Sequence, residues 1–483
     1  MAEGPSLKEK TSRGLFWGGT SSLLQQLLNA AFGIYLARTL SPDDYGLIGM
    51  LTIFNLLAYA LQDGGFVSAL INRKEIRLAD YNAVFWFSTL ISLACYLVFF
   101  FCAPLIAAFF HRQELLALSR WNFLGFVFFG LGIPFRAYLM KTLQIREISI
   151  SNITAVVISG FLGVFLAYRG FAYWALVAQA LVYSFVMNAG YWIACPWKPS
   201  FKVDFQPVKQ MFHYGSKLLI TNIFGNISNS LVSVVLGRYY TGERVGYYTQ
   251  ANKWYMMGSS VLTGMVNSVA QPVLYSVEEE RERQVRVLRK MIRFAAFITF
   301  PAMAGLAFIA PEFITTLLSD KWADSIPLLQ ILCIGGMVAP MTAIFINLIL
   351  SKGGSTQYMY VNIALFVLTL SLAYLLHPYG VTWMVTAVTI VNVLWLFVWL
   401  FFVRRAVGYT LWNLCADLLP FLGITVACIV AAYFLTRWIA DIRWLLVAKI
   451  LVTAALYVLV MWLSRSVIFK ECIIFVMEKI KHN

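Results

Sequence analysis

Long apolar runs, separated by short polar or Pro- and Gly-containing breaks, make up most of this chain. Because the hydrocarbon core of a bilayer is about 30 Å thick, one helix needs roughly 20 predominantly apolar residues to cross it. Division of the chain at its breaks predicts about fourteen spans of that length. We expect them at residues 14–37, 44–70, 81–110, 118–140, 148–168, 172–194, 211–237, 244–275, 291–318, 326–350, 355–376, 380–403, 413–436 and 441–463. The pattern therefore predicts an all-α, polytopic membrane protein.

The composition excludes a water-soluble fold. Hydrophobic residues make up 60% and charged residues 12% of the 483 positions, and the mean hydropathy is +0.75. A soluble globular chain carries roughly 25% charged residues, so this mixture cannot cover a protein with a water-soluble surface. The formal net charge of +15 would suggest nucleic acid in a soluble protein. Basic loops at a membrane surface explain it better, and we expect no nucleic-acid partner.

Lys and Arg are concentrated in every second break between the predicted spans. Cytoplasmic loops carry such an excess, and the basic breaks lie on the side that holds both ends of the chain. The strongest basic stretch is residues 278–293, EEERERQVRVLRKMIR. We therefore expect a multi-pass protein with both termini in the cytoplasm and an interfacial tail at 467–483. The outer loops are too short for an extracytoplasmic catalytic domain.

The seven cysteines are scattered, mostly inside apolar runs, and form no C-x-x-C pair. This spacing disfavours a disulfide framework and a metal site. The chain also has no Gly-Lys loop of the Walker type for phosphate binding. We therefore expect no cofactor and no ATP hydrolysis. The energy source would be a proton or sodium-ion gradient, or the pull of downstream polymerisation.

An internal repeat relates the two halves of the chain. The segment LARTLSPDDYG at 36–46 and the segment LGRYYTGERVG at 236–246 share Leu, Arg and Gly at matching positions. Further matches follow in order: Ala103-Pro104 with Ala310-Pro311, Pro134 with Pro340, Asn152 with Asn362, and Gly170 with Gly380. Because the repeat spans an even number of helices, the copies share one orientation and are related by an axis along the membrane normal. Transporters with such halves bind substrate near the bilayer midplane.

The repeat predicts two parallel six-helix lobes around a central cavity, followed by two extra helices. We expect the N-lobe at residues 1–195 and the C-lobe at 211–405, joined by a cytoplasmic linker at 196–210. The extra helices follow at 406–466, and the interfacial tail completes the chain. Asp417 and Lys449 lie in the extra pair, and we interpret both as structural.

Several short motifs resemble those of a known family. They are S-L-K-E-K-T followed by Phe16-Trp17-Gly18-Gly19, Arg38 with Tyr45-Gly46, Asp63-Gly64-Gly65 with I-N-R-K-E at 71–75, H-Y-G-S at 213–216, and D-K-W at 320–322. In this order, over nearly the whole chain, they are similar to Wzx-type polysaccharide flippases, of the colanic acid exporter kind. The resemblance implies the polysaccharide transport family of the multidrug/oligosaccharidyl-lipid/polysaccharide (MOP) exporter superfamily.

The resemblance also implies a function. Such proteins move undecaprenyl-diphosphate-linked repeat units from the cytoplasmic to the periplasmic leaflet of a bacterial inner membrane, by alternating access. We therefore expect a transporter and not an enzyme. Its partners would be an undecaprenyl-diphosphate-linked oligosaccharide, the membrane lipids and a polysaccharide polymerase complex. The glycan and the coupling ion stay open.

Bases inside the predicted spans are candidate substrate contacts, because such residues are costly in hydrocarbon and usually face the interior. Lys253 is the deepest base, has aromatic residues on both sides, and would contact the diphosphate or an acidic sugar. Lys217 and Arg136 lie nearer the cytoplasmic ends of their spans and would capture the head group. For all three, the alternative is a side chain that snorkels to the interface.

Other polar residues complete the candidate site. Arg38 and its repeat partner Arg238 would guide release at the outer face, or are ordinary cations at helix C-termini. Asp63 would couple transport to an ion gradient, or is the structural partner of a Lys or Arg. Four further residues would bind sugar hydroxyls or pack between helices: Gln25, Asn29, Asn222 and Asn226. The sequons at Asn152 and Asn226 lie in apolar spans and carry no information.

Two alternatives to the flippase stay open. One is another exporter of the same fold, either a peptidoglycan-precursor flippase or a cation-coupled drug exporter. The candidate cations favour an anionic, sugar-bearing lipid over cationic drugs. The other is a membrane glycosyltransferase or polymerase, suggested by Asp43-Asp44 in the first outer loop. The small outer loops and the parallel repeat argue against an enzyme.

Overall fold

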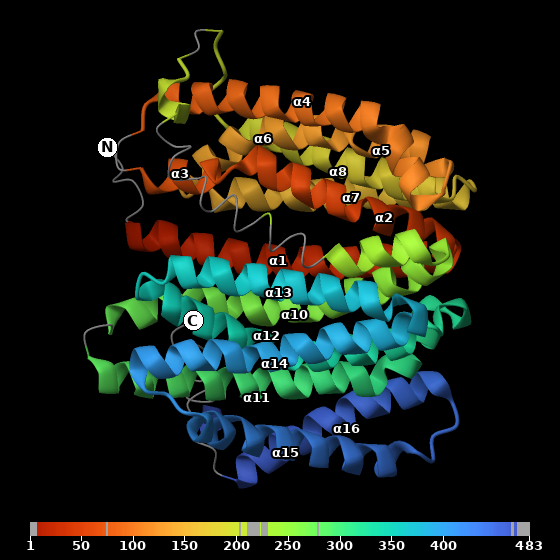
Figure 1. Cartoon of the computed structure of the whole chain (residues 1–483), viewed down its shortest axis with the longest axis vertical. Helices are drawn as coiled ribbons and strands as arrows, with labels where there is room; N and C mark the ends of the chain where they lie inside the picture. The colour runs from red at the N-terminus through yellow and green to blue at the C-terminus, as the bar shows by residue number, and fades with distance from the viewer. Residues whose placement is uncertain are drawn as a thin grey trace. The chain divides into compact units, whose positions relative to one another are not determined.

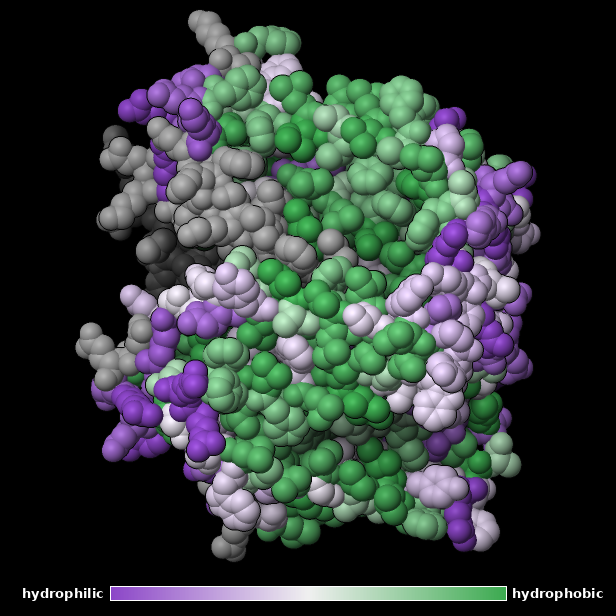
Figure 2. All heavy atoms as spheres, viewed as in Figure 1, coloured by the Kyte–Doolittle hydropathy of each residue, from purple (hydrophilic) through white to green (hydrophobic). Residues whose placement is uncertain are grey.

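The computed structural model describes residues 7–73, 76–201, 204–209, 223, 230–277, 280–464 and 468–470. Every regular element in these residues is a helix (Figure 1). Eleven of the described helices are long and apolar enough to cross a membrane. Apolar side chains cover the middle of the helices, and hydrophilic side chains gather at their ends (Figure 2). This distribution is the one that a bilayer requires of a spanning bundle.

The chain forms two compact units, Met1–Gly246 and Tyr247–Asn483. Helices of the first unit are α1 (Leu7–Thr39), α2 (Pro42–Asp63), α3 (Phe66–Asn72), α4 (Leu78–Phe110), α5 (Glu114–Asn122), α6 (Leu124–Lys141), α7 (Ile145–Tyr168), α8 (Tyr173–Ala194) and the shorter Ser230–Tyr239. α7 packs against α1 and α8, while α6 packs against α4 and α8. α2 also packs against α6 and α8, so these four helices lie together.

The predicted span at 44–70 is wrong as one helix. Two consecutive glycines, Gly64 and Gly65, have φ angles of 49° and 76°, a left-handed conformation that is costly for other residues. The chain therefore ends α2 at Asp63 and begins α3 at Phe66. The break leaves Asp63 at a helix end, with backbone N–H groups close by.

Small residues let α4 and α6 approach closely. The hydroxyl of Ser88 donates to the carbonyl of Gly130 over 3.0 Å, and a Cβ at Gly130 would overlap the side chain of Ser92. Further along α6, the buried ring of Phe135 lies 5.4 Å from that of Trp197. These contacts fix the position of α6, the helix that carries Arg136.

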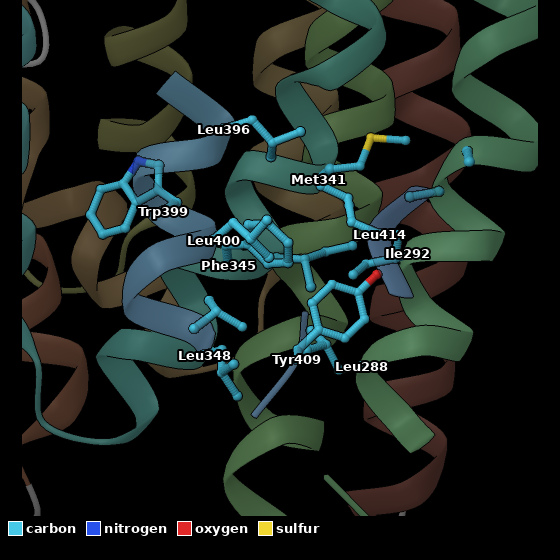
Figure 3. Close-up of a cluster of buried hydrophobic side chains, with 14 of the residues drawn as sticks. Leu288, Ile292, Met341, Phe345, Leu348, Leu396, Trp399, Leu400, Tyr409 and Leu414 are labelled. Atoms are coloured by element: carbon cyan, nitrogen blue, oxygen red, sulfur yellow. The ribbon is translucent and has the colours of Figure 1, made fainter. Parts of the chain in front are cut away.

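Helices of the second unit are arranged around α11 and α12. They are α10 (Gly242–Ser276), which begins in the first unit, α11 (Arg281–Phe313), α12 (Ser325–Ser351), α13 (Ser355–Leu376), α14 (Val381–Val407), α15 (Leu411–Thr436) and α16 (Ile442–Leu463), with short helices η1 (Ile314–Leu318), η2 (Asp320–Trp322) and η3 (His377–Tyr379). Their core buries Ile292 of α11, Phe345 of α12, Leu400 of α14 and Tyr409 (Figure 3). The Phe345 and Tyr409 ring centroids are 5.9 Å apart.

Buried ion pairs attach α15 and α16 to α11. The fully buried Asp417 accepts hydrogen bonds from Arg289 over 2.9 Å and from Arg293 over 2.5 Å. Lys449 donates to Glu312 over 2.6 Å, and both side chains are buried. Unpaired charges in such places are costly, so these contacts support the structural interpretation of Asp417 and Lys449.

A symmetric glycine contact matches the predicted repeat. The segments 36–46 and 236–246 correspond at a shift of 200 residues. In the structure, a Cβ at Gly46 would overlap the carbonyl of Gly242, and a Cβ at Gly246 would overlap the carbonyl of Pro42. Position 46 thus meets 242 while 246 meets 42, the reciprocal pattern of a two-fold contact.

The remaining predictions of spans and boundaries differ in how far the structure tests them. The described helices follow the remaining predicted spans closely, except that 118–140 contains the joint between α5 and α6. Most of the span at 211–237 and the tail at 467–483 lie outside the described residues. The first unit continues past the expected linker at 196–210 to Gly246, and the lobe boundaries stay predictions.

Candidate functional site

A polar cavity of about 270 Å³ lies inside the first unit. It is lined where α2 ends and by α6, α7 and α8. Its polar lining residues are Asp63, Arg136, Asn152, Tyr183, Asn188 and Tyr191. Such a set is unusual within apolar helices, because polar and ionisable residues at membrane depth are costly and usually functional. Two of the predicted site residues, Asp63 and Arg136, meet here.

Asp63 is positioned by the break between α2 and α3. Its carboxylate accepts hydrogen bonds from the backbone N–H groups of Gly65 and Val67. These donors are available because the two glycines turn the backbone at the start of α3. The side chain is half-buried. The carboxylate is therefore held at the cavity wall by backbone donors and remains close to Arg136.

Arg136 presents an exposed guanidinium from an otherwise well-packed part of α6. Its neighbours Phe135 and Ala137 are buried, whereas Arg136 itself is exposed at the cavity. The guanidinium lies close enough to Asp63, Tyr183 and Tyr191 to interact electrostatically with each of them. A guanidinium offers five N–H donors in a fixed, planar arrangement that matches phosphate and carboxylate oxygens.

Amide and phenol groups form the opposite wall. The hydroxyl of Tyr191 donates to Oδ1 of Asn152 over 2.7 Å. The amide of Asn188 donates to the carbonyls of Phe128 and Ser184 over 3.0 and 2.7 Å. Gly132 makes room for Asn188, because a Cβ at Gly132 would overlap the amide. These internal hydrogen bonds fix the positions of the Asn188 and Tyr191 side chains at the cavity.

The cavity combines one cation, one anion and several neutral hydrogen-bonding groups. This set can bind an anionic oxygen-rich group at Arg136 and hydroxyl groups at the amides and phenols. Among the residues that the structure describes, no three His, Cys, Asp or Glu side chains are placed to hold a metal ion.

Lys253 lies in the second unit, about a third of the way along α10, and its side chain is half-buried. The adjacent Trp254 is buried and packs edge-on against Phe313, with the ring centroids 5.0 Å apart. A Cβ at Gly336 would lie 2.8 Å from the ring of Tyr255. The predicted aromatic surroundings of Lys253 are thus partly core packing of α10 against its neighbours. Its substrate contact stays a prediction.

The other predicted site residues that the structure describes are absent from the cavity lining. Gln25 donates to the carbonyl of Ser21 within its own helix, and Asn29 is exposed on α1. Arg38 is exposed at the end of α1. Arg238 donates to the carbonyl of Phe109 and to Nε2 of His111. Lys217, Asn222 and Asn226 lie outside the described residues.

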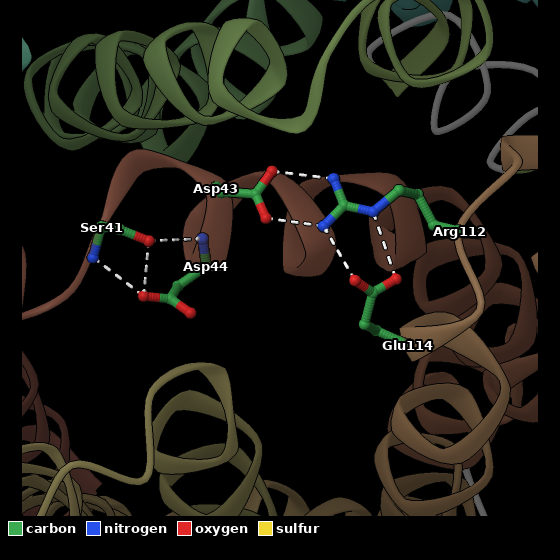
Figure 4. Close-up of polar contacts among 5 residues, drawn as sticks. All are labelled: Ser41, Asp43, Asp44, Arg112 and Glu114. Carbon is green, nitrogen blue, oxygen red and sulfur yellow. Dashed lines mark hydrogen bonds and ion pairs between the residues drawn. The ribbon is translucent and has the colours of Figure 1, made fainter.

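The acids that suggested an enzyme have structural partners (Figure 4). Asp44 caps the start of α2, accepting from the N–H and hydroxyl of Ser41 over 2.8 and 2.7 Å. Asp43 accepts two hydrogen bonds from Arg112, of 2.8 and 2.6 Å. The hydrogen bonds to Asp43 raise the pKa of the Arg112 guanidinium above its ordinary value. Both carboxylates are used in holding helix ends.

Sequence reasoning missed four of the polar residues in the cavity, namely Asn152, Tyr183, Asn188 and Tyr191. Tyr183, Met187 and Tyr191 repeat every four residues along α8 and all line the cavity, a spacing that places them on one face of a helix. That periodicity was the available signal. Asn152 was considered only as a sequon, although its match to Asn362 in the repeat was a sign that this position matters.

Comparison with known proteins shows the family of the chain. A family model described as "Polysaccharide biosynthesis protein" matches residues 35–327, more than half of the chain. Lipopolysaccharide biosynthesis protein WzxC of Escherichia coli is 24% identical, covering 69% of this chain and 68% of the relative. Teichuronic acid biosynthesis protein TuaB of Bacillus subtilis is 23% identical, covering 72% and 73%. An uncharacterised membrane protein in the cps region of Klebsiella pneumoniae is 25% identical, covering 75% and 76%.

Solved structures show the fold. The lipid II flippase MurJ, in an inward closed conformation, aligns with a TM-score of 0.76 at 15% identity, covering 93% of this chain and 98% of MurJ. An inward-facing multidrug resistance transporter of the MATE family, from the MOP superfamily, aligns with a TM-score of 0.63 at 18% identity, covering 80% and 94%. The predicted all-α, polytopic transporter fold is confirmed, and so is the resemblance to polysaccharide flippases.

Proposed function

We propose that this chain, which belongs to the polysaccharide biosynthesis protein family, exports lipid-linked polysaccharide repeat units across a bacterial inner membrane. Its cargo would be an oligosaccharide on undecaprenyl diphosphate, taken from the cytoplasmic leaflet and released in the periplasmic leaflet. A membrane polymerase that consumes the exported units would be its partner. The observation that carries this proposal is the charged cavity within apolar helices, with Arg136 exposed at its wall.

The cavity has the chemistry that such a cargo needs. A diphosphate carries negative charge that hydrocarbon does not tolerate, and a guanidinium binds phosphate oxygens through paired, charge-assisted hydrogen bonds. The amides of Asn152 and Asn188 and the hydroxyls of Tyr183 and Tyr191 lie around the same space. Sugar hydroxyls both donate and accept, so these groups suit them. The polyprenyl chain would stay in the lipid, which is itself hydrocarbon.

Asp63 would link export to an ion gradient. Its carboxylate lies near Arg136, so a proton or sodium ion on Asp63 competes with the guanidinium for the same negative charge. Binding of the ion therefore changes how strongly Arg136 holds phosphate. A ligand shifts a conformational equilibrium only through such differential binding. Alternating access, driven in this way, would expose the cavity to one leaflet and then to the other.

A cellular experiment tests this function directly. The gene is disrupted in its own host, and two quantities are measured: surface polysaccharide and lipid-linked repeat units inside the cytoplasmic membrane. We expect surface polysaccharide to be lost and repeat units to accumulate on the cytoplasmic side, and the intact gene to restore export. Normal surface polysaccharide together with arrest of peptidoglycan synthesis would instead assign the chain to peptidoglycan precursors.

A further inference from the structure

An apolar groove runs along the second unit, separate from the polar cavity. It has a volume of about 370 Å³ and lies between α10, α11 and α12. Its lining includes Leu262 and Met265 of α10 and Val287, Lys290, Phe294 and Ile298 of α11. All the lining residues except Lys290 and Thr299 are apolar. The volume falls within the range of small-ligand sites, roughly 300–1,000 Å³.

The groove is open along its side. Met265 is 56% exposed and Phe294 is 43% exposed, although both line it. A hydrocarbon chain that reaches this open side could therefore enter the groove laterally. The hydrophobic effect would not drive this entry, because the hydrocarbon chain leaves an environment that is already apolar. Specific binding from the membrane therefore needs a groove of complementary shape and a polar contact with the head group.

The length of the groove matches one leaflet. From Val287 to Ile298 the lining residues recur at helical spacing along α11, and eleven residues of α-helix cover about 17 Å. Half of a hydrocarbon core of about 30 Å is about 15 Å. The groove is thus as long as one acyl chain lying in a single leaflet.

A cation lies near one end of the groove. Lys290, near the start of α11, lines the groove and is exposed. This end carries the basic stretch that predicts a cytoplasmic location, and cytoplasmic leaflets are rich in anionic lipids.

We propose that this groove binds one acyl chain of an anionic phospholipid from the cytoplasmic leaflet, with the phosphate at Lys290. The apolar walls take the chain and set its length, while the ammonium group selects the head group. The bound lipid would pack α10 against α11 where protein side chains leave space. This proposal does not depend on the identity of the exported cargo.

Photolabelling tests the assignment. The purified full-length protein is placed in phosphatidylcholine vesicles that contain a small amount of phosphatidylglycerol with a diazirine in one acyl chain. After illumination, labelled peptides are mapped by mass spectrometry. We expect labels concentrated on the groove faces of α10 and α11. Lys290→Ala should lower the yield about fivefold, because one basic residue contributes about 1 kcal/mol at an anionic surface.

Two further variants separate the groove from general charge and from folding. Met265→Trp fills the groove from its exposed rim and should lower the yield to a similar degree. Arg286→Ala removes the same charge one turn away, at an exposed residue outside the groove lining, and should leave the yield unchanged. Equal labelling by a phosphatidylcholine probe, labels spread evenly over all helices, or displacement by an equal amount of undecaprenyl phosphate would each overturn the proposal.

Discussion

At the scale of single residues, the first unit brings a guanidinium and a carboxylate to one cavity inside apolar helices. Arg136 is exposed there while its neighbours on α6 are buried. Asp63 is held by backbone N–H groups at the glycine break. Both groups line the cavity, whereas Asp417 and Lys449 in the second unit form buried contacts between helices. The function of Arg136 and Asp63 is therefore best tested by changing charge with little change in shape.

The substitution Arg136→Gln should lower export at least tenfold at an unchanged amount of protein in the membrane. A hydrogen bond to a charged group contributes roughly 1.5–3 kcal/mol, and each 1.4 kcal/mol is about a factor of ten. The matched control is Arg146→Gln, because Arg146 is exposed at the start of α7 and stacks on Trp17. Transport is measured in vesicles with both variants. Equal rates for the two variants would remove Arg136 from the site.

Asp63 either couples transport to an ion gradient or has only a structural role, and the substitution Asp63→Asn distinguishes these two interpretations. Asp63→Asn keeps an oxygen that accepts from the Gly65 N–H but carries no charge. We expect this variant to unfold within about 4 °C of the original protein and to lose the stimulation of transport by an ion gradient. If Asp63→Asn keeps full stimulation by the gradient, the carboxylate has only a structural role.

At the scale of secondary-structure elements, the first turns of α2 and α10 meet through glycines. Gly46 has no room for a Cβ because of Gly242, and Gly246 has none because of Pro42. The same spacing appears in both copies of the repeat, so the sequence match at 36–46 and 236–246 has a packing cause. Close backbone approach of this kind requires glycine.

Replacing these glycines with alanine should therefore destabilise the protein. Overpacking of a tight contact costs roughly 1–3 kcal/mol, so Gly46→Ala and Gly246→Ala should each lower the thermal midpoint of the purified protein. Gly264 of α10 has open space where its Cβ would lie, and Gly264→Ala should leave the midpoint unchanged or raise it. An equal change in the thermal midpoint of all three variants would show that close packing is not the reason for glycine at 46 and 246.

The attachment of α16 can be tested through its buried ion pair. Lys449→Met leaves Glu312 buried without a partner, which costs roughly 3–5 kcal/mol. The double variant Lys449→Met with Glu312→Gln removes both charges and should regain most of that loss. The free energy of unfolding of the purified protein is measured for both single variants and the double variant. If the losses in unfolding free energy of the two single variants add up to that of the double variant, Lys449 and Glu312 do not stabilise each other.

At the scale of the whole molecule, the sequence predicted the membrane fold well. Spans follow from apolar runs, whose length is set by the bilayer, so most described helices lie where they are expected. The error at 44–70 arose because the left-handed turn at Gly64 and Gly65 is invisible in a hydropathy pattern. The repeat could be seen because tight packing at Gly46 and Gly246 restricts both copies in the same way.

The site could be predicted only in part. Asp63 and Arg136 stood out because charge is rare within spans. Asn152 and Asn188 did not, because single polar residues in apolar helices pack between helices as often as they bind a ligand. Only the tertiary contacts of α6, α7 and α8 show that these side chains share one cavity. The aromatic setting of Lys253 belongs partly to core packing, which sequence spacing cannot distinguish from a binding surface.

The most direct test of the proposed export is transfer of a fluorescent undecaprenyl-diphosphate oligosaccharide between leaflets of vesicles that contain the purified protein. We expect transfer that depends on the protein, rises when a proton or sodium-ion gradient is imposed, and falls at least tenfold with Arg136→Gln. Absence of transfer for every lipid-linked oligosaccharide tried, with a folded protein in the vesicles, would contradict the proposed function.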